Sequence, residues 1–250
     1  VQINIDDCER VLTKKTKAIM PVHLFGFTPD MDKVTAFAKK HNLLIIEDAA
    51  QALGIKWNGK GCGSLGDVGC FSFFADKTLT TAEGGFVTTN DDEIYDNLLF
   101  LRNQGRRGRG TFVHPRIGYN FRMTDIQCAI GLAQLKKFDR LVEKKNKIHQ
   151  RYTEAFSGFE HVDIYQPPEQ VSPFVPFRVI LRTKSDEADQ LMEHMRTKAF
   201  ELWADDPRHH PSNFPMSSKS YDNGICLPSF VAISDEQLDH VCKTIKEYYG

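Results

Sequence analysis

The first part of the chain alternates short apolar runs with a segment of helical periodicity. Residues 16–23 and 43–46 are apolar runs of strand length, and the segment between them repeats apolar residues at helical spacing: Met31, Val34, Phe37 and Ala38. Thr28 and Pro29 supply an N-cap and a first-turn proline, so we expect the helix to begin there. This βαβ unit predicts a parallel sheet with helices on its faces. Residues 1–15 are polar and predict neither a strand nor a capped helix.

The next segments continue the pattern of strands and helices. Asn58-Gly59 predicts a tight hairpin. Residues 69–74 and 86–89 are short apolar strands, separated by a polar turn that contains Lys77 and ends at Gly84-Gly85. Residues 90–93 then provide an N-cap and an acidic first turn for a helix that runs to Gly105.

The second half of the chain predicts a different organisation. Thr124 and Gln127 fit a capping box at the start of a long helix that we expect to end near Phe156. Beyond Gly158 the predicted elements are a proline-marked linker, a strand at 174–181, a helix at 185–197, a loop at 205–218, an edge strand at 225–228 and a helix capped by Ser234. We expect a large domain at 1–135, a connecting helix at 136–158 and a small α+β domain at 159–250.

Composition narrows the possible functions. The chain carries 32 basic and 33 acidic side chains, a balance that disfavours nucleic acid as a partner. No apolar run has the length of a membrane span, and the N-terminus lacks the order of a signal peptide, so we expect a cytoplasmic protein without a membrane partner. The six cysteines are scattered, with no metal-ligand spacing, which predicts reduced thiols and no metal site.

Polar side chains with distinct chemistry follow two of the predicted strands. Asp48 comes directly after one strand, with Gln51 three residues later, and Ser72 and Lys77 follow the other. Open α/β sheets bind ligands at this edge, where a lysine beside apolar surface has a lowered pKa and can act as a nucleophile or Schiff-base partner. A solvated loop lysine and a helix-capping aspartate are the alternatives for Lys77 and Asp48. Together the residues are those that a pyridoxal 5'-phosphate site requires.

Four strings in the chain resemble the DegT/StrS family of nucleotide-sugar aminotransferases: residues 47–52 (EDAAQA), 71–77 (FSFFADK), 83–85 (EGG) and 118–122 (GYNFR). The resemblance extends over nearly the whole chain and implies an α/β fold of type I, with a mostly parallel sheet, helices on both faces and a small C-terminal α+β domain. It implies that Lys77 carries pyridoxal 5'-phosphate covalently and shuttles the proton, and that Asp48 pairs with the pyridine nitrogen. It further implies that Gln51 binds the phenolic oxygen, Ala50 packs on the ring, and Ser72 binds the phosphate.

The resemblance also implies partners. Asn120 would reach the phosphate of a neighbouring subunit, which predicts a homodimer with shared active sites. The expected reaction transfers an amino group from glutamate to a nucleotide-linked 4-keto-6-deoxy sugar in polysaccharide (lipopolysaccharide O-antigen) biosynthesis, and residues 71–77 and 225–229 look most like the perosamine-synthase branch, which uses a GDP-linked sugar. The alternatives are a sugar dehydratase, against which Lys77 argues, a truncated or non-catalytic partner subunit, and a dinucleotide-binding module, for which no G-x-G-x-x-G follows a strand.

Two departures from the family pattern carry further expectations. Ala82 stands where the family usually has glycine, and its methyl group predicts a negative φ there. The family also carries a segment upstream of the point where this sequence begins, which holds the cofactor phosphate at a helix N-terminus. We therefore expect that a chain of these 250 residues alone would bind the cofactor poorly and bury an uncovered apolar face in an oligomer.

Overall fold

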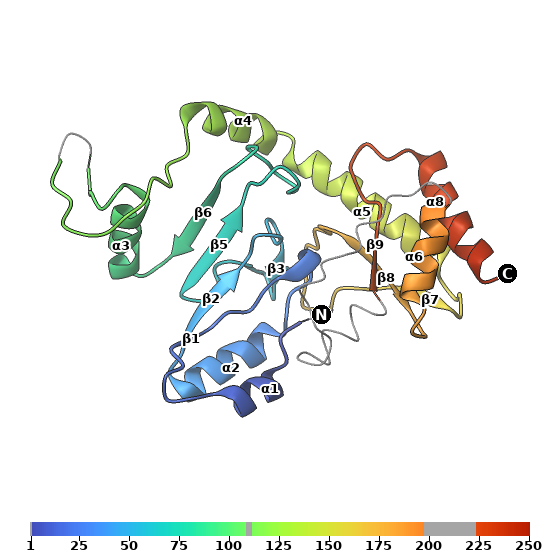
Figure 1. Cartoon of the computed structure of the whole chain (residues 1–250), viewed down its shortest axis with the longest axis horizontal. Helices are drawn as coiled ribbons and strands as arrows, with labels where there is room; N and C mark the ends of the chain where they lie inside the picture. The colour runs from blue at the N-terminus through green and yellow to red at the C-terminus, as the bar shows by residue number, and fades with distance from the viewer. Residues whose placement is uncertain (1, 109–111, 198–223) are drawn as a thin grey trace.

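The computed structural model describes residues 2–108, 112–197 and 224–250. Figure 1 shows two groups of elements, one around a four-stranded sheet and one around a three-stranded sheet, with helix α5 leading from the first to the second. Each group has its own cluster of buried apolar side chains. The boundaries at residues 135 and 158 remain a prediction. Within the described residues, no helix is both long enough and apolar enough to cross a membrane.

The larger sheet has the order β1-β2-β5-β6. Its strands are β1 (Ala18–Ile19), β2 (Leu44–Asp48), β5 (Val68–Ser72) and β6 (Gly85–Thr89). The first three are parallel and β6 is antiparallel, which confirms the predicted, mostly parallel sheet. The predicted strand at 16–23 is shorter than expected, because only Ala18–Ile19 and a bridge from Val22 to Asp48 pair with β2.

Helix α2 (Met31–His41) buries the apolar face that its periodicity predicts, with Val34, Phe37 and Ala38 in the core beside Ile45. Its predicted start was wrong. The N-cap is Asp30, whose carboxylate accepts a hydrogen bond from the backbone N–H of Lys33. Thr28 does not cap the helix, because its buried hydroxyl lies 3.4 Å from the sulfur of Cys62.

The N-terminal segment was also mispredicted. Residues Ile5–Val11 form helix α1, capped by Asn4, which accepts a hydrogen bond from the N–H of Asp6. The sequence of this segment has no strong apolar period that would predict a helix, and no side chain of α1 is fully buried in the fold. Ion pairs and hydrogen bonds from Glu9 to Lys40 and His41 help to attach α1 to α2 instead.

The hairpin and the start of the next helix agree with the sequence, whereas that helix ends at Arg102, before the expected Gly105. Strands β3 (Lys56–Trp57) and β4 (Lys60–Gly61) are joined by Asn58 and Gly59, both with positive φ, as the predicted tight turn requires. Helix α3 (Asp92–Arg102) is capped by Asp91. A one-turn 3-10 helix, η1 (Leu24–Gly26), follows β1.

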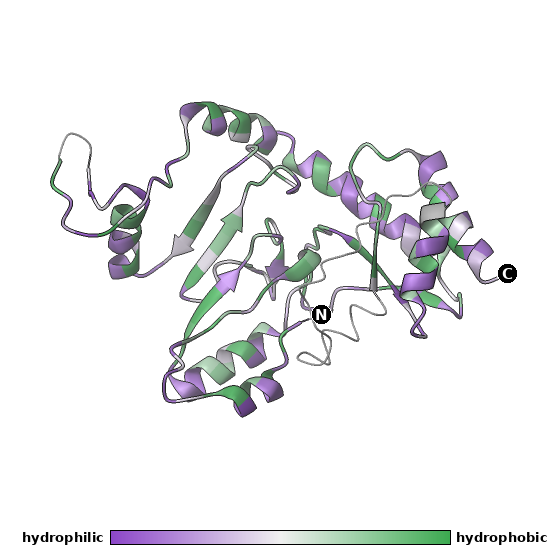
Figure 2. Ribbon diagram, in the orientation of Figure 1, coloured by the Kyte–Doolittle hydropathy of each residue, from purple (hydrophilic) through white to green (hydrophobic). Residues whose placement is uncertain are grey.

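The long helix predicted from Thr124 to about Phe156 is interrupted. Helix α4 (Asp125–Leu135) starts with the predicted capping box, and α5 (Phe138–Ala155) follows after Lys136 and Lys137. The two helices differ in how deeply their side chains are buried. None of the residues of α4 is buried, whereas α5 buries Ile148 and Tyr152 in the C-terminal core. Figure 2 shows a contrast in hydropathy as well: α4 is largely hydrophobic, whereas hydrophobic and hydrophilic residues alternate along α5.

The C-terminal group is an antiparallel sheet in the order β7-β8-β9, formed by Val162–Ile164, Val179–Thr183 and Gly224–Leu227. Helices α6 (Ala188–Thr197) and α8 (Asp235–Tyr248) pack with it, and Ser234 caps α8 as predicted. Strand β8 begins five residues later than expected, after the proline-containing segment that precedes it. The predicted loop at 205–218 lies outside the described residues.

Candidate active site

Asp48 is the last residue of β2, the strand that lies between the two strands parallel to it, β1 and β5. Its backbone N–H donates to Pro21 O at 2.9 Å, and its carbonyl accepts from the N–H of His23 at 3.0 Å, while β5 pairs with it through Cys70. Its side-chain Oδ1 accepts from the N–H of Ala50 at 3.1 Å. This local bond holds the half-buried carboxylate at the edge of the sheet where the sequence predicts a ligand.

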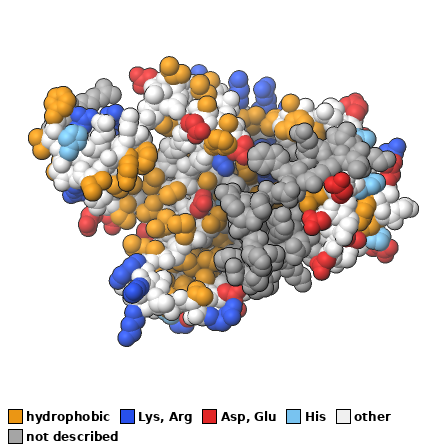
Figure 3. Space-filling view, viewed as in Figure 1, with side chains coloured by type: hydrophobic (Ala, Val, Ile, Leu, Met, Phe, Trp, Pro, Cys, Tyr) orange, Lys and Arg blue, Asp and Glu red, His pale blue; other side chains and the backbone are white. Residues whose placement is uncertain are grey.

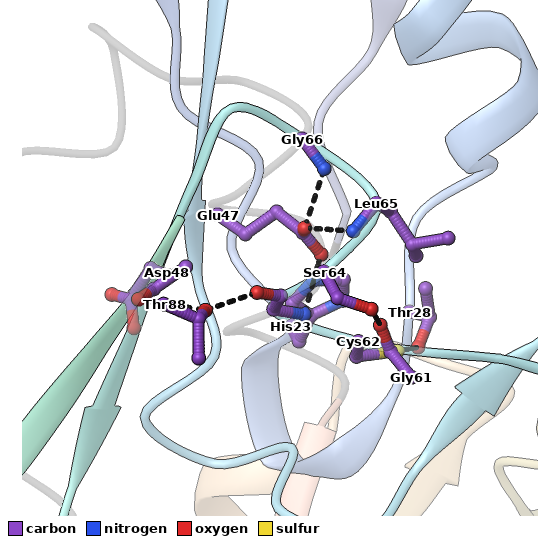
Figure 4. Close-up of polar contacts among 12 residues, drawn as sticks. His23, Thr28, Glu47, Asp48, Gly61, Cys62, Ser64, Leu65, Gly66 and Thr88 are labelled. Atoms are coloured by element: carbon purple, nitrogen blue, oxygen red, sulfur yellow. Dashed lines mark hydrogen bonds and ion pairs between the residues drawn. The ribbon is translucent and has the colours of Figure 1, made fainter. Parts of the chain in front are cut away.

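The neighbouring residue Glu47 is fully buried, on the opposite face of the strand, and its carboxylate accepts four hydrogen bonds. Nε2 of His23 lies 2.9 Å from Oε2, and three backbone N–H groups lie 2.6 to 2.7 Å from the oxygens: those of Gly63, Leu65 and Gly66 (Figure 4). The pair joins the segment after β1 and the end of β2 to the turn before β5. It therefore supports the end of β2 that carries Asp48.

The electrostatics of this support are unusual for a buried pair. Burial opposes the charged form of His23, but contacts with Cys62 and Glu47 outweigh it and raise the pKa of His23 to about 9. Burial also opposes ionisation of Glu47, but hydrogen bonds from His23, Gly63 and Gly66 lower its pKa. These contacts favour an imidazolium paired with a carboxylate, while Nδ1 of the His23 ring is buried without a hydrogen-bond partner within the described residues. Sequence reasoning missed this pair, although a histidine and a glutamate at the ends of adjacent strands were a usable signal.

Gln51 is oriented by the backbone of η1. Its Oε1 accepts a hydrogen bond from the N–H of Phe25 at 2.5 Å, which brings the segment after β1 against the segment after β2. Ala50, between Asp48 and Gln51, is half-buried. The three residues that the sequence predicts at this edge therefore follow one another on a short turn whose backbone and side chains are held from both sides.

Lys77 extends from the turn between β5 and β6, with 15% of its side chain exposed. Its Nζ lies 3.6 Å from Oδ1 of Asp76 and 4.8 Å from the centre of the Phe177 ring. The guanidinium of Arg178 donates to Oδ2 of Asp76 at 3.0 Å and lies over the same ring. A lysine held by an aromatic face and a single carboxylate differs from the solvated loop lysine that was the alternative.

A second lysine approaches the ring of Phe177. Lys145, on α5, is buried, donates to the carbonyl of Phe177 at 3.1 Å, and has its Nζ 5.7 Å from the centre of the ring. Burial, with the nearby charge of Arg178, lowers the pKa of Lys145 to about 8. The sequence did not single out this cluster of cations, because its members come from three separate segments.

Ser72 ends β5, and its Oγ accepts a hydrogen bond from the N–H of Phe74 at 3.2 Å. The turn that follows is closed by backbone bonds from Phe73 to Gly84 and from Thr81 to Phe73. Ala82, in this turn, has a φ of +67°, so the expected negative φ was wrong. The turn imposes the left-handed conformation that glycine would adopt more easily, and the Ala82 N–H is satisfied by the hydroxyl of Thr80.

Asn120 lies on the exposed segment between α3 and α4. Its Oδ1 accepts from Nε of Arg122 at 2.8 Å, and its backbone forms a bridge with Asn103. Upstream of this segment, Arg107 pairs with Asp96 at 2.7 Å and Arg106 donates to Gln104.

The segment around Asn120 continues into an exposed apolar surface, here called the 112–135 face. It consists of side chains that are 58 to 87% exposed: Phe112, Val113, Ile117, Phe121, Ile126, Leu132 and Leu135. Apolar side chains gather along α4 and beside the larger sheet on the side seen in Figure 3. Exposed apolar side chains in this number are typical of a protein interface.

Comparison with known proteins identifies relatives over nearly the whole chain. The DegT/DnrJ/EryC1/StrS aminotransferase family matches residues 1–246. The GDP-perosamine synthase of Escherichia coli O157:H7 is 39% identical over all of this chain and 70% of its own length, and that of Vibrio cholerae is 33% identical over all of this chain and 71% of its length. Among solved structures, DesV of S. venezuelae has a TM-score of 0.88 at 26% identity, covering 99% of this chain and 69% of that one. The Brucella abortus DegT DnrJ EryC1 StrS aminotransferase has a TM-score of 0.86 at 27% identity, covering 100% and 70%.

Proposed function

Because the chain belongs to the DegT/DnrJ/EryC1/StrS aminotransferase family, we propose that it uses pyridoxal 5'-phosphate to move an amino group from glutamate to a nucleotide-linked 4-keto-6-deoxy sugar. The similarity to two proteins named GDP-perosamine synthase supports a GDP-linked sugar. The observation that carries the proposal is Lys77, a shielded amine at the same sheet edge as Asp48. The retained lysine also argues against a sugar dehydratase.

The residues present fit the cofactor. Oδ1 of Asp48 is bonded to the N–H of Ala50, and Oδ2 has no partner within the described residues, so it is available to a cationic ring nitrogen. The backbone N–H of Phe25 can only donate, so Oε1 of Gln51 faces it and the amide NH₂ is left for an anionic oxygen. The hydroxyl of Ser72 accepts from a backbone N–H and retains its own proton for a phosphate oxygen.

Each residue then has a separate task. When bound, the cofactor supplies an electron sink for the carbon that gains or loses the amine. Asp48 keeps the ring nitrogen protonated through the attraction of its carboxylate. Lys77 would anchor the cofactor, and its amine would carry the proton to and from the substrate carbon. Gln51 and Ser72 orient the ring and the phosphate, and Ala50 packs against the ring.

The 112–135 face supports a homodimer with shared sites. Exposed apolar side chains lie on both sides of Asn120 along this segment, so a second copy that covers the face would also lie near Asn120, to which the family resemblance assigns the phosphate of the neighbouring subunit. The free cysteines and balanced charge support a cytoplasmic location. Polysaccharide biosynthesis, including that of an O-antigen, is the proposed context.

Cofactor titration tests the proposal. Addition of pyridoxal 5'-phosphate should produce the absorbance of a lysine-bound cofactor, and glutamate should abolish it. Borohydride reduction followed by peptide mapping should place the label on Lys77. Lys77→Ala should prevent labelling, whereas Lys56→Ala, an exposed lysine in β3, should not. A protein that takes up no cofactor would support the alternative of a non-catalytic partner subunit.

A further inference from the structure

Residues 23–26, here called the 23–26 turn, are tied to the end of β2 at three points. The backbone N–H of His23 donates to the carbonyl of Asp48 at 3.0 Å, and its Nε2 lies 2.9 Å from the carboxylate of Glu47 (Figure 4). The N–H of Phe25 donates to Oε1 of Gln51 at 2.5 Å. One turn therefore contacts Glu47, Asp48 and Gln51.

The same turn is tied to the neighbours of Lys77. The carbonyl of Phe25 accepts from the N–H groups of Phe177 at 3.1 Å and Arg178 at 3.3 Å. The ring of Phe177 lies against the amine of Lys77, and Arg178 binds Asp76, the residue before that lysine. The N–H and the C=O of Phe25 thus connect the Gln51 side of the site to the Lys77 side.

This double attachment explains a strained backbone. Phe25 has a φ of +59° and a ψ of 12°, the left-handed region that a residue with a bulky side chain rarely adopts. Gly26 has a φ of +92°, and a Cβ there would lie 2.6 Å from the carbonyl oxygen of Val175 and 2.9 Å from the nitrogen of Phe177. Such strain persists only where the surroundings impose it, and it concentrates at functional sites.

The bond from Phe25 also decides which end of Gln51 meets a ligand. If the N–H of Phe25 turned away, the amide of Gln51 would be free to rotate and present either its oxygen or its NH₂. With the turn in place, the NH₂ is directed at the ligand as a donor. A donor fixed before binding favours an anionic oxygen without further reorganisation.

We propose that the left-handed backbone of Phe25 is a positioning element of the active site, which fixes the Gln51 amide as a donor and holds Asp48 and Lys77 in register. The inference rests on the proposed function, because the anionic oxygen belongs to the cofactor. Phe25 acts through its backbone, and its ring has no part in this role. His23 and Glu47 act as the anchor of the turn.

Two substitutions separate the backbone role from the side chain. Phe25→Asn and Phe25→Val both remove the ring, but asparagine tolerates the left-handed conformation and a β-branched residue resists it. The absorbance of the lysine-bound cofactor is titrated with pH in each purified protein, and cofactor affinity is measured by fluorescence. An oxyanion that loses a hydrogen-bond donor holds a shared proton more tightly, so the midpoint for Phe25→Val should rise by about one pH unit and the affinity should fall by about tenfold. Phe25→Asn should retain the wild-type midpoint and affinity.

A destabilised control distinguishes positioning from general loss of stability. Val34→Ala opens a cavity in the buried core of the same group of elements, on α2, and should lower the melting temperature while leaving the midpoint unchanged. If Phe25→Val shares the midpoint of Phe25→Asn, or if Val34→Ala shifts it equally, the inference is wrong. A wild-type protein without any cofactor absorbance would instead overturn the proposed function.

A second pair of substitutions with a smaller backbone effect tests the inference if Phe25→Val does not fold. Phe25→Gly adopts the left-handed backbone freely and Phe25→Ala does so at a cost, so the same order of midpoints is expected with a smaller difference. Identical midpoints in this pair, with folded protein in both cases, would overturn the inference as well.

Discussion

Replacing Glu47 by glutamine should severely destabilise the protein, because the fully buried carboxylate is the acceptor for four donors. An amide offers one acceptor oxygen, so about two of the four bonds are lost and an NH₂ faces N–H groups. Hydrogen bonds to a charged acceptor contribute roughly 1.5 to 3 kcal/mol each. Truncating a buried ion pair typically costs about 3 to 5 kcal/mol, and we take about 4 kcal/mol as the expected loss.

The pH dependence of the free energy of unfolding gives a second, independent estimate of what the pair contributes to stability. The pKa of His23 is raised from its ordinary 6.5 to about 9, so its contribution to stability is fully present below pH 6.5 and is lost as the pH rises through 9. A difference of this size corresponds to about 3 kcal/mol in total. Without the carboxylate of Glu47, one of the two contacts that raise the pKa of His23 is removed and the contact with Cys62 remains, so this loss between pH 6.5 and 9 should become smaller.

Chemical denaturation of both proteins between pH 6 and 9.5 measures both effects. Lys145, whose pKa is lowered to about 8, adds stability as the pH rises, but it does so equally in the two proteins and cancels in their difference. Glu143→Gln is the matched control, because this exposed glutamate pairs only with Lys147 within the described residues and should change stability little. A Glu47→Gln protein within about 1 kcal/mol of wild type, with an unchanged pH profile, would refute the account of the pair.

Three further predictions test other parts of the account. Asp48→Asn should leave the melting temperature nearly unchanged and lower transamination at least about a hundredfold, because the amide cannot hold the ring nitrogen protonated; full turnover in a single-turnover assay would exclude that role. Ile126→Asp should shift the protein toward monomer in sedimentation at micromolar concentration, whereas Lys147→Asp, away from the 112–135 face, should not, and equal dimer content in both would count against the interface. Lys145→Met should raise the stability at pH 7 by about 1 to 3 kcal/mol in urea denaturation, because burial lowers the pKa of this lysine and so disfavours its charged form. A loss of stability would show that the hydrogen bond from Lys145 to the carbonyl of Phe177 outweighs the cost of desolvating the amine.

The elements that the sequence predicted correctly are those specified by local chemistry. The caps at Thr124 and Ser234 and the Asn58-Gly59 hairpin depend on residues a few positions apart, and all three are present. The errors depend on distant partners. Thr28 has the chemistry of an N-cap, but its hydroxyl is directed to Cys62, so Asp30 caps the helix. The break after Leu135 was missed because the residues on both sides are good helix formers.

The site was predictable in part for the same reason. Asp48, Gln51, Ser72 and Lys77 follow the strands on which they depend, so their placement at one edge follows from strand order and the parallel pairing of β2 and β5. Their roles remain proposals. The support under Asp48 depends on the pairing of His23 with Glu47, residues 24 positions apart. Only the folded chain shows that they meet.

Phe25 illustrates what a sequence pattern cannot convey. A phenylalanine between Leu24 and Gly26 indicates an apolar segment, and nothing in its local propensity predicts a left-handed backbone. The conformation is imposed by acceptors and donors on both sides, Gln51 on one and Phe177 with Arg178 on the other, which lie 26 and about 150 residues away in the chain. Local preference is overruled here because several non-local hydrogen bonds outweigh the cost of one strained residue, roughly 1 to 3 kcal/mol. Where a chain accepts such a cost between its lysine and its carboxylate, the geometry of that turn is part of the site.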